Sequence, residues 1–166
     1  MLIRTLTLVG GLAGAGTLAQ FPEFSQQYTQ RLGGAVEALG EVVADFDASA
    51  QAEGLTRAQA LAEMTGGDFV ERRQADMQRT FERHAYLQSA QQALQDAGPF
   101  MRAYHVGKLT DTELMGQTAD IFKPAVPVTF EGLVFAALGF LAGLGAVSLI
   151  LRVMTAPFRR RRLNRA

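Results

Sequence analysis

Apolar positions form two long runs near the ends of the chain, and a pattern of helical period lies between them. The second run, Gly132 to Leu151, holds 20 residues without a charge. As a helix it would be roughly 30 Å long, about the hydrocarbon thickness of a bilayer. A buried helix in a domain of this size would carry a polar face, and here Ser148 is the one polar side chain. The pattern predicts a transmembrane helix within residues 127–154.

The first run is mostly small and apolar. It extends from Thr5 to Phe21 and reaches 20 residues when it is counted from Leu2. Arg4 would then extend its guanidinium group to the interface. We expect residues 1–21 to form a second transmembrane helix. The alternative is a secretory signal peptide cleaved after Ala19, because a basic start, a short apolar centre and small residues before the cut are its features.

Small residues recur at four-residue spacing in both runs. This spacing places them on one helix face, where they let two helix backbones approach closely in lipid. We predict that these residues pack membrane helices together and that leucine in their place would disrupt assembly. The alternative is that glycine and alanine are simply common in membrane helices. The pairs are Gly10 with Gly14, Gly139 with Gly143, and Ala142 with Ala146.

The first part of the segment between the runs has the spacing of a coiled-coil seam, with apolar residues alternately four and three apart. A second stripe beside the seam is rich in glycine, which costs about 1 kcal/mol in a helix relative to alanine. We expect these glycines to mark a close backbone contact with a neighbouring helix, the alternative being a local kink. The seam is Tyr28, Leu32, Ala35, Leu39, Val42 and Phe46. The candidates for helix packing or partner binding are Tyr28, Arg31, Leu32, Gly33, Gly34, Leu39 and Gly40.

Capping and stop signals divide the rest of this segment. Thr56 opens a short helix with a capping box, and Asp68 is the expected N-cap of a long helix that stops at Gly98, before a proline. Thr110 or Asp111 would cap one more helix. The two long helices are of similar length with a turn region between them, which favours an antiparallel pair. The predicted fold is all-α, with two transmembrane helices and a long antiparallel helical hairpin between them.

Charge predicts the topology. All 16 acidic residues lie between Glu23 and Glu131, where nine basic residues accompany them. All charged residues of the tail, residues 155–166, are arginines. Lys or Arg next to a span stays in the cytoplasm. We therefore expect both termini to be cytoplasmic and residues 22–126 to lie on the outer side of the membrane. Arg159, Arg160, Arg161 and Arg162 would attract lipid headgroups. Nucleic-acid binding is not expected, because the tail is short and tethered.

Candidate chemistry is sparse. The chain has no cysteine and two histidines, His84 and His105. Each histidine is expected to be structural, because no acid lies three or four residues from His84 to complete a metal site. Glu131 opens the second run, and we expect its carboxylate to reach the interface. The sequence shows no phosphate-binding glycine loop and no nucleophile motif, so we expect no enzyme activity, no cofactor and no metal.

One stretch resembles a known family. The residues from Gln20 to Leu39 read QFPEFSQQYTQRLGGAVEAL and follow a glycine-rich first run. The motif QFPEF..QY.QRLGG is similar to that of an uncharacterised bacterial family, catalogued as a domain of unknown function. The resemblance implies a small two-span protein of the bacterial inner membrane that retains its first run, so that residues 22–126 would be periplasmic. It carries over no catalytic residues.

These patterns lead to one expectation and two rivals. We expect a non-enzymatic inner-membrane protein whose helical hairpin mediates assembly, with itself or with a larger membrane complex. The bilayer is its first partner. The alternatives are a small channel or transporter accessory subunit, formed by oligomerised spans, and an envelope enzyme with a site at His84 or His105.

Overall fold

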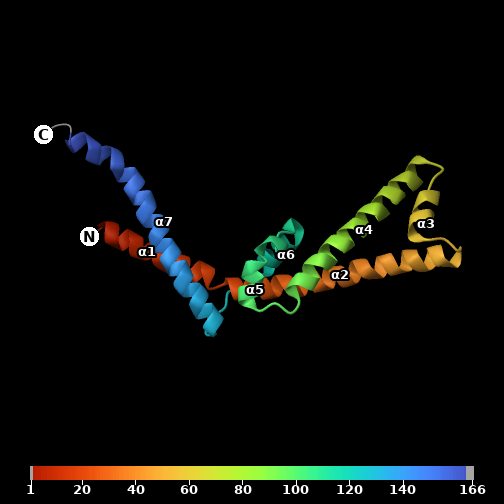
Figure 1. Cartoon of the computed structure of the whole chain (residues 1–166), viewed down its shortest axis with the longest axis horizontal. Coiled ribbons are helices and arrows are strands. Elements are labelled where there is room, and N and C mark those ends of the chain that lie inside the picture. Colours follow the sequence, from red (N-terminus) through yellow and green to blue (C-terminus); the bar gives the residue numbers. More distant parts are fainter. Residues whose placement is uncertain (1, 164–166) are drawn as a thin grey trace. The chain divides into compact units, whose positions relative to one another are not determined.

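The computed structural model describes the backbone of residues 2–163 and the side chains of residues 3–155, and every regular element in these residues is helical (Figure 1). The predicted all-α class is therefore confirmed. The chain forms two compact units, the first made of Met1–Ser25 with Phe122–Ala166 and the second of Gln26–Ile121. The elements are α1 (Leu2–Leu18), α2 (Phe21–Ala52), α3 (Arg57–Glu63), α4 (Asp68–Leu94), α5 (Pro99–Tyr104), the 3₁₀ helix η1 (Val106–Lys108), α6 (Thr112–Ile121) and α7 (Phe130–Leu163).

The first unit is an antiparallel pair of helices, α1 and α7, which lie against each other along most of α1 (Figure 1). In the described residues one helix is long and apolar enough to cross a membrane, Phe130–Thr155, with a mean hydropathy of 2.4. Only 11% of that stretch is buried within the chain. α1 is equally apolar in character but has 17 residues, which is shorter than a full span. A second span thus stays a prediction.

The helix α7 continues beyond the apolar stretch. Its backbone is helical to Leu163, through Pro157, whereas the apolar stretch ends at Thr155, one residue after the predicted end of the span. Proline removes one helical hydrogen bond and therefore often ends a helix. The free-energy cost is finite, however, so a helix can continue through a proline. The freed carbonyl group lies beyond the apolar run, where water can satisfy it.

The second unit contains a helical hairpin. α4 returns along α2 in the opposite direction, with α3 between their far ends (Figure 1). Phe46 of α2 meets Phe81 of α4 edge to face, with ring centroids 5.2 Å apart. Arg57, which begins α3, lies over the Phe81 ring and donates from Nε to Asp47 Oδ1 at 2.7 Å. The short helix is thereby fixed to both long helices.

The buried face of α2 differs in part from the predicted seam. Tyr28 and Leu32 are fully buried, as the seam predicts. The prediction is wrong for Val42, which is 44% exposed. Val36 and Val43, from the second stripe, are buried instead. A straight helix of 3.6 residues per turn drifts about 20° per heptad against a 3.5-residue repeat. The contact with α4 therefore passes from one stripe to the other along α2.

The glycines of α2 do not mark a close backbone approach, which corrects the expectation. A Cβ at Gly33 would lie 3.5 Å from Gln91 Nε2, and one at Gly40 would lie 3.4 Å from His84 Nε2. Both neighbours are the ends of side chains, which reach across and fill the space beside the glycines. A Cβ at Gly34 would meet nothing within 4 Å. Nor is there a break at these positions, because α2 is helical throughout.

The capping predictions mostly hold. Thr56 forms the predicted capping box with Gln59, and Asp111 caps α6 by accepting from Leu114 N at 3.0 Å. Asp68 is the exception, because it is the first residue of α4 and Gly67 holds the N-cap position. Gly67 has a φ of 156°, part of a turn that a glycine backbone adopts without strain.

Candidate functional site

The glycines predicted to pack membrane helices lie where α1 and α7 cross, whereas the third predicted pair, Ala142 and Ala146, is exposed. A Cβ placed at Gly139 would overlap the carbonyl oxygen of Gly14, and a Cβ at Gly14 would overlap the carbonyl oxygen of Gly139. Gly143 and Gly10 repeat the arrangement one turn along, where a Cβ at Gly143 would overlap the carbonyl oxygen of Gly10. Four glycines thus bring the two backbones into direct contact.

This contact has the geometry of a weak hydrogen-bonded pair. The Cα of each central glycine faces the carbonyl oxygen of the other, a Cα–H···O arrangement that recurs at close helix crossings. Gly11 completes the fit, since the Phe140 ring lies where its Cβ would be. Of the other glycines of these two helices, Gly16 and Gly145 face open space, and Gly132 packs on Pro127 just before α7 rather than on α1. The glycines at the crossing therefore differ from the others by their surroundings and not only by their spacing.

The motif QFPEF ties the first unit together, which is a role that the sequence analysis did not foresee. The Gln20 amide bonds both backbone groups of Ala125, donating from Nε2 at 3.1 Å and accepting at Oε1 at 3.0 Å. Phe24 meets Phe122 with ring centroids 5.6 Å apart. Phe21 meets Phe135 at 5.1 Å.

The contacts of this motif link the turn after α1 to the segment that leads into α7. That segment has no regular structure over residues 122–128. Its backbone groups at Ala125 therefore depend on the Gln20 side chain for partners. The motif itself was the sequence signal for these contacts. The partners of the motif lie about a hundred positions further along the chain, so periodicity does not reveal them.

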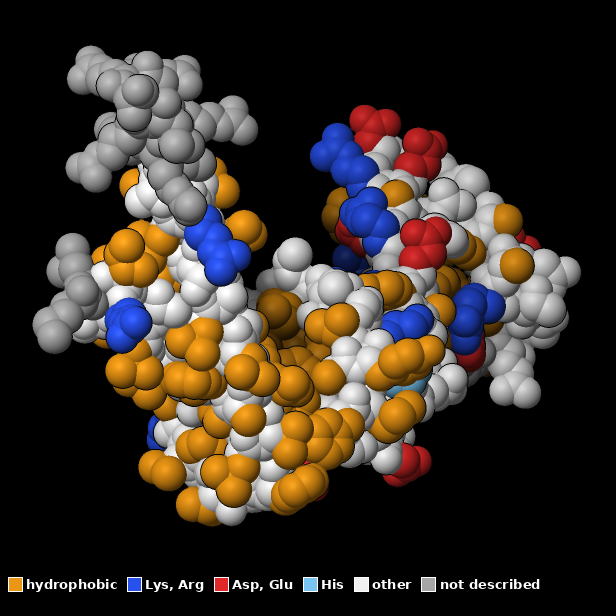
Figure 2. Space-filling view, turned by 60° about the vertical axis from the view of Figure 1, so that its left-hand side comes forward, with side chains coloured by type: hydrophobic (Ala, Val, Ile, Leu, Met, Phe, Trp, Pro, Cys, Tyr) orange, Lys and Arg blue, Asp and Glu red, His pale blue; other side chains and the backbone are white. Residues whose placement is uncertain are grey.

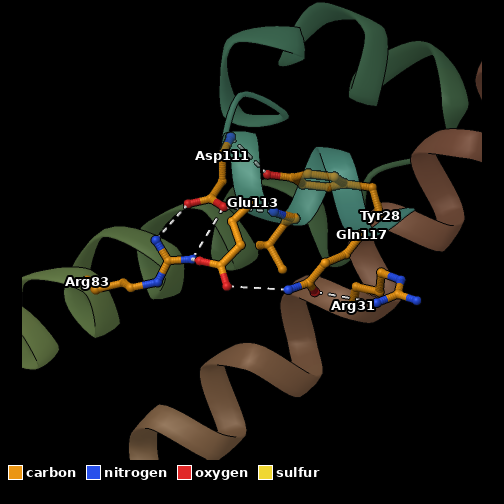
Figure 3. Close-up of polar contacts among 7 residues, drawn as sticks. Tyr28, Arg31, Arg83, Asp111, Glu113 and Gln117 are labelled. Atoms are coloured by element: carbon orange, nitrogen blue, oxygen red, sulfur yellow. Dashed lines mark hydrogen bonds and ion pairs between the residues drawn. The ribbon is translucent and has the colours of Figure 1, made fainter. Parts of the chain in front are cut away.

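The second unit contains a polar cluster at the start of α6 (Figure 3). Asp111 is buried and lies between α4 and α2. Its carboxylate accepts from both guanidinium nitrogens of Arg83, at 3.2 and 3.4 Å, while its backbone N–H points to Tyr28 Oη at 3.4 Å. Arg83 also donates to Glu113 Oε2 at 2.8 Å. One carboxylate thus caps α6 and holds it against α4.

The cluster continues outward to α2. Glu113 accepts from Gln117 Nε2 at 3.3 Å, and Gln117 Oε1 lies 3.5 Å from Arg31 Nη1 (Figure 3). Of the predicted interaction candidates, Tyr28 and Arg31 therefore meet α6. Leu39 is half-buried on the same helix, away from the cluster. Periodicity placed Tyr28 in the core but gave no sign that Arg83 and Asp111 would join it.

Burial changes the acidity of Tyr28. Removal from water raises the pKa of the phenol above its ordinary value of 10.0, and the hydrogen bond from the Asp111 backbone opposes this only in part. Above pH 10 the unfolded chain loses this proton while the folded chain keeps it. The folded unit is therefore favoured below pH 10 and becomes less stable as the pH rises further.

We expect the free energy of unfolding of the second unit to fall as the pH rises above 10. Tyr28→Phe removes the buried phenol, so the variant should lose this part of the pH dependence. Denaturant titrations between pH 8 and 11, followed by circular dichroism, compare the two proteins. Tyr104→Phe is the control, because Tyr104 is 78% exposed. Equal pH slopes for wild type and Tyr28→Phe would contradict the assignment.

The remaining candidates lie apart from these sites. His84 is half-buried against Gly40, and the His105 ring stacks edge to face on Tyr104 at 5.1 Å. Glu131 is half-buried in the first turn of α7. Within the described residues no three His, Asp or Glu side chains gather as a metal site. The side chains of Arg159, Arg160, Arg161 and Arg162 lie outside the described residues.

Comparison with known proteins gives one match. A family model described as a protein of unknown function (DUF2937) matches residues 2–160. No curated protein and no solved structure matches the chain. The match confirms the expected membership of an uncharacterised family, while the motif and the two spans stay predictions.

Proposed function

For this chain, which belongs to the family described as a protein of unknown function (DUF2937), we propose a role as a non-enzymatic membrane-anchored assembly protein. Its first unit anchors the chain in the bacterial inner membrane, and its second unit binds a second copy of the chain. The proposal depends most on the surface of α1 and α7, where large apolar side chains face outward.

The first unit presents its apolar residues outward rather than to a core. Hydrophobic side chains cover much of the face of this unit that Figure 2 shows. A water-soluble helix pair would hide these residues, and an exposed apolar surface of this extent marks contact with lipid or protein. The exposed residues include Leu6, Leu8, Val9, Leu12, Leu133, Leu138, Leu141, Leu149, Ile150 and Val153.

We propose that α1 and α7 both cross the bilayer. The antiparallel glycine crossing joins them, and packing of this kind drives helix association in lipid. α1 is about 26 Å long, which local thinning of the bilayer or the adjoining turn would accommodate. The basic tail keeps the carboxy-terminus cytoplasmic, so the amino-terminus is cytoplasmic too and residues 22–126 are periplasmic.

The second unit has a surface suited to a partner. Phe100, Met101, Tyr104 and Val106 on α5 and η1 are each exposed by 45% or more. Residues 99–108 also contain two basic residues and no acid. We call this surface the aromatic–basic patch, and it is the kind of surface that aromatic anchors and cations give to interfaces.

Charge complementarity points to a second copy as the occupant. On α2, Glu37, Glu41 and Asp45 are exposed and four residues apart, so they form one acidic face. Between Arg31 and Arg57 this helix and its loop hold no basic residue. The patch of one copy and the acidic face of another have opposite charge, which favours and orients their encounter.

We expect a photo-crosslinking amino acid at Tyr104 to trap a dimer of this chain in intact membranes. The same group at Arg79 is the control, because Arg79 is exposed on α4 outside the patch. It should trap no dimer. Immunoblots and mass spectrometry of the adducts read the result. Lys108→Glu should weaken the Tyr104 adduct, and Glu41→Lys should restore it in the same chain.

Other outcomes would change the proposal. Adducts with a different membrane protein alone would replace self-assembly by membership of a larger complex. A monomer at both positions, or a chain that alkaline carbonate washes from the membrane, would contradict the proposed role.

A further inference from the structure

One end of the α1–α7 pair contains a groove between the two helices. It lies at the end where α1 begins, on the far side of the glycine crossing from Phe130. The volume of the groove is about 220 Å³. Both polar and apolar side chains line it: Ile3, Thr7, Ser148, Leu151, Arg152 and Thr155.

The groove offers one cation without a protein partner. The Arg152 side chain is exposed and makes no hydrogen bond or ion pair with the residues whose side chains the structure describes. No acidic residue lines the groove. A guanidinium group that lines the groove and has no protein partner can donate to an occupant of the groove, and phosphate oxygens are ligands that match its fork geometry.

The hydroxyl groups of the two threonines in the groove favour a ligand that carries hydrogen-bond donors. Thr7 donates its proton to the Ile3 carbonyl oxygen at 2.8 Å, and Thr155 donates to the Leu151 carbonyl oxygen at 2.8 Å. Each hydroxyl oxygen therefore keeps only its lone pairs for a ligand and acts as an acceptor. A ligand that donates from hydroxyl groups beside its phosphate fits this arrangement.

The position of Arg152 along α7 sets the depth of the groove. It lies 22 residues after Phe130, where α7 begins. At 1.5 Å per residue this distance is about 33 Å, close to the hydrocarbon thickness, so the guanidinium group lies at the level of the headgroups. This step rests on the proposed membrane placement of the first unit.

We propose that this groove binds the headgroup of phosphatidylglycerol from the inner leaflet. Arg152 pairs with the lipid phosphate, the glycerol hydroxyl groups of the headgroup donate to Thr7 and Thr155, and an acyl chain lies along Ile3 and Leu151. Basic pockets between membrane helices on the cytoplasmic side bind anionic headgroups in this manner. The site is distinct from the general attraction of the arginine tail for an anionic surface, because it requires a shaped contact at one residue.

The test compares lipid binding by the purified full chain in a neutral detergent. Native mass spectrometry with titrated lipids gives the affinity for phosphatidylglycerol, phosphatidylethanolamine and phosphatidic acid. We expect the wild type to prefer phosphatidylglycerol over phosphatidylethanolamine, and Arg152→Gln to lose about tenfold in affinity for it, as for one charge-assisted hydrogen bond. Arg4→Gln removes the same charge from an exposed position outside the groove and should change the affinity by less than about threefold.

A second variant tests the hydroxyl groups. Thr7→Val keeps the shape of the side chain but removes its acceptor oxygen. It should lower the preference for phosphatidylglycerol over phosphatidic acid, which lacks headgroup hydroxyl groups, and leave the binding of phosphatidic acid unchanged.

The outcomes separate the groove from the membrane placement. Equal losses from Arg152→Gln and Arg4→Gln would overturn the site and leave only diffuse attraction. An unaltered lipid preference in Arg152→Gln would also overturn it. In either case a chain that stays with the membrane after carbonate extraction still supports the anchor, whereas a chain that is extracted fails the proposed function itself.

Discussion

Alanine at Gly139 is expected to open the contact between α1 and α7. Its methyl group would overlap the carbonyl oxygen of Gly14, and a Cβ there would also lie 2.7 Å from Leu18 Cβ. Backbone cannot move aside as the end of a side chain can, so the helices must separate. Overpacking of this kind costs about 1–3 kcal/mol, and the lost backbone contacts add to it. Gly14→Ala should act in the same way, because the contact is reciprocal.

The chain supplies matched controls for this prediction. Gly145→Ala in α7 and Gly16→Ala in α1 add the same methyl group where nothing lies within 4 Å. Alanine favours a helix over glycine by about 1 kcal/mol, so these two variants should be neutral or slightly more stable. A loss in Gly139→Ala must therefore come from the crossing and not from helix propensity.

Hydrogen exchange measured by mass spectrometry on peptides from α1 and α7 is the suitable readout. It reports the opening of the first unit separately from the second, which a single melting curve of a two-unit chain does not. Faster exchange in Gly139→Ala and Gly14→Ala, with unchanged exchange in the second unit, is the expected result. If all four variants exchange alike, the glycines do not hold the crossing.

Local signals in the sequence predicted most of the helices. The Thr56 capping box and the cap at Asp111 follow from side chains three residues from their partners, so the chemistry is visible in a short window. The span over α7 follows from composition alone. The apolar stretch ends at Thr155, one residue beyond the predicted end, although the helix itself continues through Pro157 to Leu163.

The glycines show where such reasoning reaches its limit. Spacing identified Gly14 and Gly139, and the structure places both at a backbone crossing. The same reasoning applied to Gly34 and Gly40 was wrong, because long side chains of α4 fill the space or nothing does. Which partner faces a glycine depends on contacts between distant parts of the chain, and a single sequence without its relatives does not record them.

The polar cluster and the hydrogen bonds between Gln20 and Ala125 were missed for the same reason. Arg83 and Asp111 are 28 positions apart, and Gln20 and Ala125 are 105 apart. Asp111 was predicted only as a cap, and composition and periodicity describe the near neighbours of a residue in the chain and not its distant partners. The QFPEF motif indicated that Gln20 and its neighbours matter, but only the fold shows what they contact.

Alanine at Asp111 is expected to destabilise the second unit by about 2 kcal/mol, since it removes an N-cap and a partly buried ion pair together. Leu114 N would lose its acceptor and Arg83 would lose its partner on α6. Arg83 is 38% exposed, so solvent weakens the ion-pair contribution, and the cap supplies about half of the effect. Chemical denaturation followed by circular dichroism measures the loss.

Asparagine at the same position separates the two contributions. Asn caps a helix as well as Asp does, so Asp111→Asn keeps the bond to Leu114 N and loses only the charge. We expect it to cost about 1 kcal/mol, which Arg83→Met should match. Asp76→Ala is the control, because Asp76 forms exposed pairs within α4 and its removal should cost less than about 0.5 kcal/mol.

A double-mutant cycle then decides whether Asp111 joins α6 to α4. If the two residues act through their ion pair, Asp111→Asn combined with Arg83→Met should cost little more than either change alone. No loss from Asp111→Asn would mean that Asp111 stabilises α6 only as a cap, and additive losses would mean that the two residues act through other partners, Arg83 through Glu113. The contact to Glu113 is shorter, at 2.8 Å against 3.2 and 3.4 Å, but we expect coupling to Asp111, because two guanidinium nitrogens of Arg83 face its buried carboxylate and only one faces the exposed carboxylate of Glu113.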